Sequence, residues 1–166
     1  MDIDEYRQER EALHIAYRRH YAPLVRFCAL LAADHATAED IVQDVFVRGG
    51  SRIVRLPETA QLPYLRRAVT NEWKNRQRRR VLDLRVARFR VGASTTGDET
   101  AGASDRHVDL WAAILRLPPK QRACLVLRYY EDLTEAETAS VLGVRVGTVK
   151  SQVSRALSKL REVVER

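Results

Sequence analysis

The segment that most constrains this chain spans residues 133–155, LTEAETASVLGVRVGTVKSQVSR, and it predicts two short helices joined by a tight turn. Thr134 and Glu137 have the spacing of a capping box, in which each side chain bonds the other residue's backbone amide. Gly143 stands between the two helices, where a sharp turn needs a positive φ. The first helix then has a short apolar face formed by Ala136, Ala139 and Leu142.

The second helix of this pair is expected to begin at Gly147 or Thr148 and to carry two different faces. Apolar residues recur every three or four positions and should point inward: Val149, Val153, Leu157 and Leu160. The opposite face is polar and can reach the phosphates and base edges of duplex DNA through Thr148, Lys150, Ser151, Gln152, Ser154 and Arg155. A helical hairpin with a glycine turn would give part of this pattern without binding DNA. The agreement of cap, turn and faces favours a DNA-binding helix-turn-helix.

Composition agrees with a polyanionic partner but does not specify one. The chain of 166 residues carries 29 Lys and Arg against 22 Asp and Glu, a formal net charge of +7. Its length fits one domain or two small ones. We expect no membrane insertion, because no apolar run is long enough to cross a bilayer. The acidic, polar N-terminus is unlike a secretory signal and favours a cytoplasmic location.

The two cysteines, Cys28 and Cys124, each lie in an apolar helical context. Two distant cysteines form neither a zinc site nor a disulfide framework. We interpret them as small core side chains, with a redox role as the alternative.

The order of patterns predicts an all-α protein with two small helical domains. The first domain is assigned to residues 1–90, a linker to 91–106 and the second domain to 107–166. Within the linker, the stretch 92–104, GASTTGDETAGAS, is poor in large apolar side chains and is expected to be flexible.

Prolines and glycines set the expected helix limits in both domains. A helix starting near Tyr6 should be kinked or interrupted at Pro23. A second helix should begin near Thr37, with Asp40 at capping-box distance, and end at Gly49 and Gly50. Further helices are expected to begin at Pro63 and Pro119, because proline is favoured in the first helical turn.

A second basic element covers residues 64–80, YLRRAVTNEWKNRQRRR, with a single acidic residue. Its cations can attract phosphates without sequence preference, and its amides and aromatic ring can contact bases of an unpaired strand. The candidate residues are Asn71, Trp73, Lys74, Asn75, Arg76, Arg78 and Arg79. Two alternatives stay open: the run is a solvated helix end, and Trp73 belongs to the core.

A third element, AEDIVQDVFVR at residues 38–48, predicts an amphipathic helix with a dense polar face. This face is either a solvated surface or a docking surface for another helix, where charges select the partner. The residues alone do not separate these two interpretations.

These three elements, in this order, resemble the extracytoplasmic-function (ECF) group of bacterial sigma factors over nearly the whole chain. The stretch AEDIVQDVF is similar to the helix with which that family binds the clamp of core RNA polymerase, which favours docking. The matching positions are Asp40, Gln43, Asp44 and Phe46.

The basic segment is similar to the family's helix for promoter melting and minus-ten recognition. Asn71 matches an asparagine that lies near the flipped minus-ten base, whereas Trp73 replaces a small residue. The C-terminal segment resembles the family's minus-thirty-five reader. Gln152 replaces a basic residue and Ser154 a bulkier one, which bears on the sequence read and not on whether DNA is bound.

The resemblance implies an alternative sigma factor that binds core polymerase and directs initiation at promoters with minus-ten and minus-thirty-five elements. An anti-sigma factor is a further candidate partner. No catalytic, cofactor or metal constellation is found in the sequence, so we expect no enzymatic activity. The competing classes are a stand-alone helix-turn-helix regulator, which binds DNA tightly alone and usually as a dimer, and a non-specific nucleic-acid-binding protein.

Overall fold

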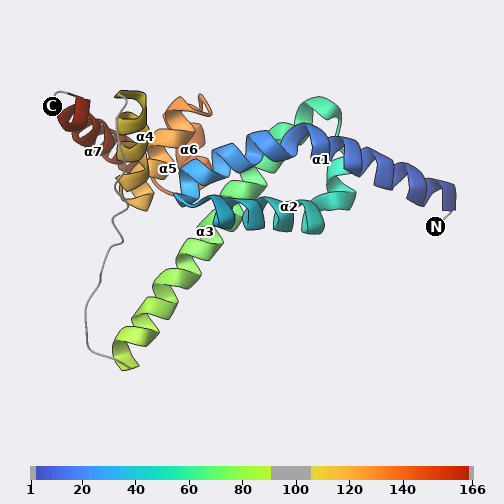
Figure 1. The fold of residues 1–166 in the computed structure, drawn as a ribbon, viewed down its shortest axis with the longest axis horizontal. Coiled ribbons are helices and arrows are strands. Elements are labelled where there is room, and N and C mark those ends of the chain that lie inside the picture. The colour runs from blue at the N-terminus through green and yellow to red at the C-terminus, as the bar shows by residue number, and fades with distance from the viewer. Residues whose placement is uncertain (1–2, 91–105, 165–166) are drawn as a thin grey trace.

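A computed structural model describes residues 3–90 and 106–164, and the regular structure in these two ranges is entirely helical (Figure 1). The first range forms α1 (Ile3–Ala32), α2 (His35–Arg55) and α3 (Glu58–Arg90). The second forms α4 (Arg106–Arg116), α5 (Pro119–Tyr129), α6 (Glu135–Leu142) and α7 (Val146–Val164). The prediction of an all-α fold is confirmed. The flexible linker predicted at residues 92–104 lies outside the described residues.

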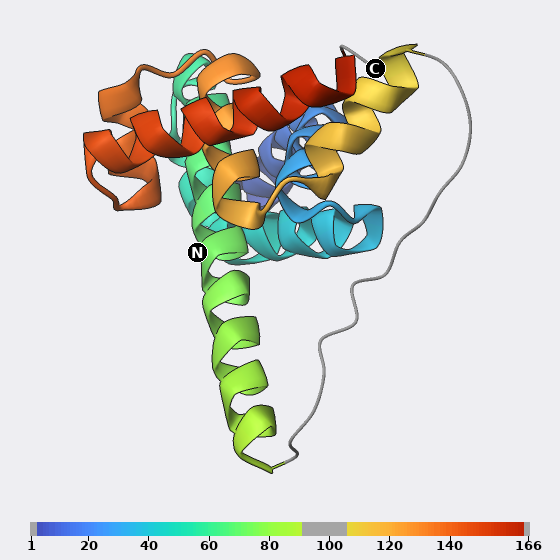
Figure 2. The same cartoon turned by 90° about the vertical axis from the view of Figure 1, so that its left-hand side faces the viewer.

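The core of the first domain is built where α1, α2 and α3 meet. Side chains that are almost fully buried come from all three helices: Leu24, Phe27, Leu31, Ile41, Val42, Ile53, Leu65 and Val69. Their spacing of three or four residues places one apolar stripe of each helix toward the centre. The C-terminal part of α3 continues beyond this core and projects away from the other helices (Figures 1 and 2).

Of the two alternatives at Pro23, an interruption is excluded, because α1 continues from Ile3 to Ala32 with the proline inside it. The predicted end of α2 is wrong. Gly49 and Gly50 do not end α2. A Cβ on Gly50 would lie 3.0 Å from the Leu13 side chain, so the glycine allows α1 and α2 to approach closely within one continuous helix.

The start of α2 also differs from the prediction. Asp34 is the N-cap, and its carboxylate accepts a hydrogen bond of 2.8 Å from the backbone amide of Thr37. The predicted capping box of Thr37 with Asp40 is therefore not used. Asp34 fits the general preference for a short acidic or polar side chain at this position.

The third helix begins at Glu58, five residues before the predicted start at Pro63. Pro63 sits inside the helix near its N-terminus, and the helix tolerates it there. The side-chain amide of Gln61 donates to the backbone oxygens of Ile53 and Leu56, both at 3.4 Å. These bonds tie the first turn of α3 to the end of α2.

The second domain follows the predicted pattern more closely. Helix α5 begins at Pro119, as expected. Thr134 and Glu137 form both bonds of the capping box, and Gly143 ends α6 with a φ of 66°. The hydrogen bonds from Thr134 hold the pKa of the Glu137 carboxyl below its ordinary value. Helix α7 begins at Val146, slightly earlier than predicted.

The inward face of α7 agrees with the prediction in part. Val149 and Leu160 are buried, Val153 and Leu157 are half-buried, and Ala156 joins them. In α6 the predicted apolar residue Ala136 is exposed, and Thr138 is buried in its place beside Ala139. Cys28 and Cys124 are buried thiols, which confirms the core interpretation. Burial raises the pKa of Cys28 to about 12 and that of Cys124 to about 11.

The two domains are packed against each other. Ala123, Val126 and Leu127 of α5 belong to the same buried apolar cluster as the core of α1, α2 and α3. Helix α5 packs on α1, and α6 packs on α3. Separate, smaller clusters join α4, α5, α6 and α7.

We predict that Thr134→Ala lowers the free energy of unfolding by about 1 kcal/mol, because the capping box loses its side-chain acceptor. Urea unfolding followed by circular dichroism measures the change. Ser158→Ala, on the exposed side of α7, is the matched control and should leave stability within about 0.5 kcal/mol of the parent chain. Equal losses in the two variants would contradict a specific role for the cap.

Candidate nucleic-acid interface

The predicted DNA-reading residues lie together on one side of α7. Thr148, Lys150, Ser151, Ser154 and Arg155 are exposed, and Gln152 is half-buried. The buried residues Val149 and Ala156 fix the rotation of the helix, because both are fully covered on its opposite side. The exposed side is therefore a preorganised row of donors and cations that a DNA groove can receive.

Two polar groups of this row already have partners within the protein. Lys150 lies 3.5 Å from Glu135 at the start of α6, with 64% of its side chain exposed. The hydroxyl of Ser151 donates to the backbone oxygen of Thr148 at 3.0 Å. An exposed ion pair of this kind is weak and exchangeable, so Lys150 remains able to contact a phosphate.

The basic segment occupies the middle of α3, where the helix leaves the core. Asn71, Asn75, Arg78 and Arg79 are exposed, whereas Lys74 and Arg76 are half-buried. Figure 2 shows this helix running out from beneath the second domain as a free rod. The exposed amides and guanidinium groups are thus accessible to a nucleic-acid strand passing along α3.

Trp73 is the exception among the predicted residues of α3. Its side chain is only 5% exposed and belongs to the apolar cluster of the first domain. A ring in this position cannot stack on an unpaired base without leaving the core. The geometry therefore favours the core interpretation that the sequence left open.

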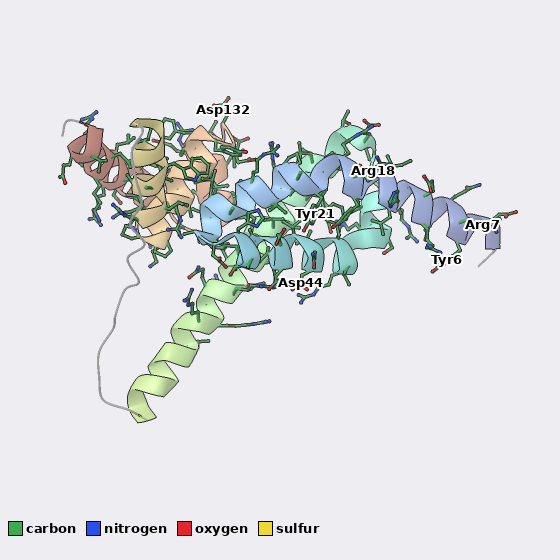
Figure 3. The ribbon with its side chains drawn as sticks, viewed as in Figure 1. Tyr6, Arg7, Arg18, Tyr21, Asp44 and Asp132 are labelled. Carbon is green, nitrogen blue, oxygen red and sulfur yellow. The ribbon has the colours of Figure 1, made fainter. Side chains whose placement is uncertain are left out.

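Arg76 connects the basic segment with the acidic face of α2. Its guanidinium lies 2.7 Å from Asp44, 3.5 Å from Glu72 and 3.9 Å from Asp40. Arg48 joins the same group through Asp44 and Glu72, each at 3.4 Å. Figure 3 labels Asp44 on α2. Arg76 is predicted to contact DNA, and Asp40 and Asp44 are predicted to contact the polymerase. In this structure they are paired with each other.

Gln43 and Phe46 line a groove of about 790 Å³ between α2 and the N-terminal half of α1, together with Arg7, Leu13, Tyr17 and Val47. Phe46 is itself only 5% exposed and packs edge-on against Tyr17, with ring centroids 5.0 Å apart. Val47 is 83% exposed. The predicted docking residues therefore have two different settings on α2: Gln43 and Phe46 line the groove, whereas Asp40 and Asp44 face Arg76 of α3.

Sequence reasoning missed three residues at the contact between the domains: Arg66, Arg122 and Glu131. Arg66 pairs with Glu131, and Arg122 is buried with its guanidinium bonded to backbone oxygens. Arg122 carried a signal, because it directly precedes the apolar run 123–127, and an arginine buried beside such a run must find hydrogen-bond partners. No pattern in the sequence pairs Arg66 with Glu131, since 65 residues separate them (131 − 66).

Neither a metal site nor a membrane span is found in the part of the chain that the structure describes. No group of three or more His, Cys, Asp or Glu residues within 3–90 and 106–164 is arranged to hold a metal ion. Among the helices of these two ranges, none is both long enough and apolar enough to cross a bilayer.

We predict that Trp73→Ala lowers the free energy of unfolding by about 3–5 kcal/mol, the usual cost of removing a large aromatic side chain from a core. Asn71→Ala, two residues before Trp73 in α3 but exposed, should change stability by less than about 0.5 kcal/mol. Urea unfolding of both variants distinguishes the two positions. A Trp73→Ala protein as stable as the parent chain would return Trp73 to the list of DNA contacts.

Comparison with known families matches both domains. The Sigma-70 region 2 model matches residues 16–81, which cover most of α1, all of α2 and the basic part of α3. The Sigma-70 region 4 model matches residues 107–160, which include the helix-turn-helix.

The chain is similar to curated sigma factors over most of its length. It is 35% identical over 143 residues to the RNA polymerase sigma-E factor of Streptomyces avermitilis, covering 86% of this chain and 79% of that protein. It is 32% identical over 161 residues to the ECF RNA polymerase sigma factor SigM of Mycobacterium tuberculosis, covering 94% and 79%.

A solved structure shares the fold of the whole chain. It is the sigma factor RpoE of Bartonella quintana, crystallised with the anti-sigma factor NepR, which aligns with a TM-score of 0.63 at 24% identity over 98% of each chain. With two family models on the two domains and relatives above 30% identity over most of their length, this chain belongs to the extracytoplasmic-function group of bacterial RNA polymerase sigma factors.

Proposed function

We propose that this chain is an alternative sigma factor that binds core RNA polymerase and directs initiation at promoters with minus-ten and minus-thirty-five elements. One observation carries the proposal: a single chain holds an exposed groove-reading helix, α7, and a separate exposed basic rod, α3, within domains that match sigma regions 4 and 2. Duplex reading and single-strand capture need two such surfaces, because the bases offer different edges in the two states.

The minus-thirty-five contact is assigned to α7. Lys150 and Arg155 supply positive charge to phosphates or base acceptors, while Thr148, Ser151, Gln152 and Ser154 supply neutral donors and acceptors. Bidentate or charge-assisted contacts to base edges typically discriminate by about 1–3 kcal/mol each. A few such contacts are enough to place the second domain on one duplex element.

The minus-ten contact is assigned to the exposed residues of α3: Asn71, Asn75, Arg78 and Arg79, with Lys74 and Arg76 in addition once their present partners are released. Extruding a base costs a few kcal/mol, which contacts in a pocket and neutralised phosphates offset. Trp73 supports this surface from within the core. We therefore assign it a packing role and not a base contact.

The polymerase contact is assigned to α2. Asp40 and Asp44 present carboxylates on one side of α2, and Gln43 and Phe46 line a groove with an apolar floor. A helix of the polymerase clamp can place apolar side chains in this groove and cations against the carboxylates. Apolar contact supplies affinity, and charge supplies the choice of partner.

Membership of the sigma family over both domains favours this function over a stand-alone regulator. A regulator would need α7 alone and would leave the acidic face of α2 and the basic rod of α3 without a role. In the proposed function the polymerase performs the chemistry, and this chain contributes no catalytic group. It acts in the cytoplasm, and an anti-sigma factor is a further candidate partner.

The groove-reading role predicts that Lys150→Ala combined with Arg155→Ala abolishes promoter-specific initiation and leaves binding to core RNA polymerase intact. The reason is that α7 loses its two cations while its buried face is unchanged. Run-off transcription with bacterial core RNA polymerase on fragmented genomic DNA measures initiation, and co-purification measures binding.

Lys159→Ala combined with Arg161→Ala is the matched control for that variant. Both residues are exposed on α7, about one to two turns beyond Arg155, the last residue of the proposed reading face. The control should initiate at the same start sites as the parent chain. If the Lys150 and Arg155 variant initiates normally, the assignment of the reading face to this part of α7 is wrong.

The docking role predicts that Asp44→Ala weakens binding to core RNA polymerase by roughly tenfold, which corresponds to about 1.4 kcal/mol. Glu58→Ala removes one carboxylate from a different ion pair of the same domain, that with Arg19, and should not change the affinity. Titration of labelled core polymerase gives both values. Equal affinities of the two variants would move the polymerase contact away from the acidic face of α2.

A further inference from the structure

One wall of the groove between α1 and α2 lies mostly outside the part of the chain that matches the family. Its lining residues on α1 are Arg7, Arg10, Glu11, Leu13, His14 and Tyr17, whereas the Sigma-70 region 2 match begins only at residue 16. The first turns of α1, which carry Arg7, extend beyond the other helices (Figures 1 and 3). This wall is therefore an addition to the residues of α2 that the family match includes.

The position of the wall against α2 is fixed by contacts between the two helices. Leu13 packs so closely on Gly50 that a Cβ there would lie 3.0 Å from the leucine side chain. Glu9 pairs with Arg55, near the end of α2, at 3.8 Å. The groove of about 790 Å³ is thus already formed in the free chain, and a partner does not have to open it.

The shape and the floor of the groove fit a helix. Leu13, Tyr17 and Phe46 make the floor apolar, and Val47 adds an apolar side chain that is 83% exposed. Residues 7–17 of α1 span about 15 Å, which is roughly three helical turns. Over that length an amphipathic helix presents apolar side chains at positions i, i+3, i+4 and i+7.

The α1 wall carries positive charge that the described residues do not neutralise. Arg7 and Arg10 are exposed, and neither has an ion pair with another described residue. The guanidinium carbon of Arg10 lies 5.9 Å from the centroid of the Tyr6 ring. His14 is exposed beside them, and Glu11 is the single carboxylate among the described lining residues. Two guanidinium groups against one carboxylate leave this wall cationic.

Charge complementarity selects the occupant of such a groove. Carboxylates along one edge of a helix can accept charge-assisted hydrogen bonds from the two guanidinium groups while the apolar face covers the floor. Cations along that edge would meet like charge instead. The proposed polymerase contact requires cations against Asp40 and Asp44, which is a different chemistry.

We propose that the first turns of α1 and the middle of α2 form a docking groove for an amphipathic helix of a protein partner, acidic along the edge that faces Arg7 and Arg10. This inference does not rest on the proposed function, because it follows from the shape, the apolar floor and the charge of the groove.

Two designed peptides of about 14 residues, long enough for more than three helical turns, probe the groove. Both carry leucines along one helical face, and the neighbouring edge carries glutamates in one peptide and lysines in the other. Each is labelled with a fluorophore and titrated with the full chain, and fluorescence anisotropy gives the dissociation constant. The glutamate peptide should bind roughly tenfold more tightly than the lysine peptide.

Charge reversal in the wall tests where the peptide binds. Arg7→Glu combined with Arg10→Glu should weaken binding of the glutamate peptide roughly tenfold and strengthen binding of the lysine peptide. The formal charge of +7 attracts an acidic peptide to the whole chain, so the control needs the same change of charge. Arg26→Glu combined with Arg67→Glu replaces two exposed arginines outside the groove and should keep the preference for glutamate.

Truncation of the apolar rim tests the other half of the contact. Val47→Ala should weaken binding of the glutamate peptide severalfold, because the peptide then loses apolar contact. Ile15→Ala, at a position that is 50% exposed on α1 but outside the groove, should leave the affinity unchanged.

Tighter binding of the lysine peptide to the parent chain would overturn the inference and give the groove to a cation-bearing helix. It would also be overturned if neither peptide bound, or if the two double variants, at full helical content, lost equal affinity for the glutamate peptide. Sedimentation of the chain alone tests a second copy as the occupant. A parent chain that is dimeric, and that becomes monomeric with Arg7→Glu and Arg10→Glu, would place that copy in the groove and overturn the inference too.

Discussion

The hydrogen bonds of the buried Arg122 guanidinium hold the second domain on the first. Arg122 is only 4% exposed and has no carboxylate partner within hydrogen-bond reach among the described residues. Its Nη1 donates to the backbone oxygens of Leu115 and Leu117, which closes the turn between α4 and α5. Its other donors reach Leu31 at the end of α1. A charge placed in an apolar interior requires such bonds, so one side chain fixes both the turn within the second domain and the position of that domain on the first.

Local rules predicted the second domain better than the first, and the difference has a physical cause. The limits of α5 and α6 depend on Pro119, Thr134 and Gly143, and each of these acts on the backbone within a few residues. The limits of α2 and α3 depend on contacts with other helices. Gly50 lies within α2 and not at its end, and its lack of a side chain leaves room for Leu13 of α1 to pack against it. The early start of α3 is secured by the hydrogen bonds of Gln61 to the end of α2. A pattern read along one helix contains no information about such neighbours.

The same distinction applies to the candidate site. The polar row on α7 could be read from the sequence, because a helix with a regular buried side leaves its other side to solvent. Phe46 follows the apolar face of Ile41, Val42 and Val45 and is buried with it. Trp73 follows Leu65 and Val69 at intervals of four residues, but the amides and cations around it also allowed a base contact, and only its burial decides between the two. Arg66 and Glu131 were beyond prediction, since the contact between two separately patterned domains depends on their shapes.

The free chain neutralises several of the cations that the proposed function would give to DNA. Arg76 is held by Asp44 and Glu72, Lys150 by Glu135, and Lys74 by the backbone of Val141. Binding to DNA gains free energy largely through the release of counterions from phosphates that protein cations neutralise. A cation that must first leave a protein partner contributes less than a free one. The formal charge of +7 already counts these carboxylates against the cations, but it does not show which cations are free to contact DNA. A partner that occupies the acidic face of α2 would return Arg76 to the DNA, and in this way binding of polymerase would strengthen binding of the promoter.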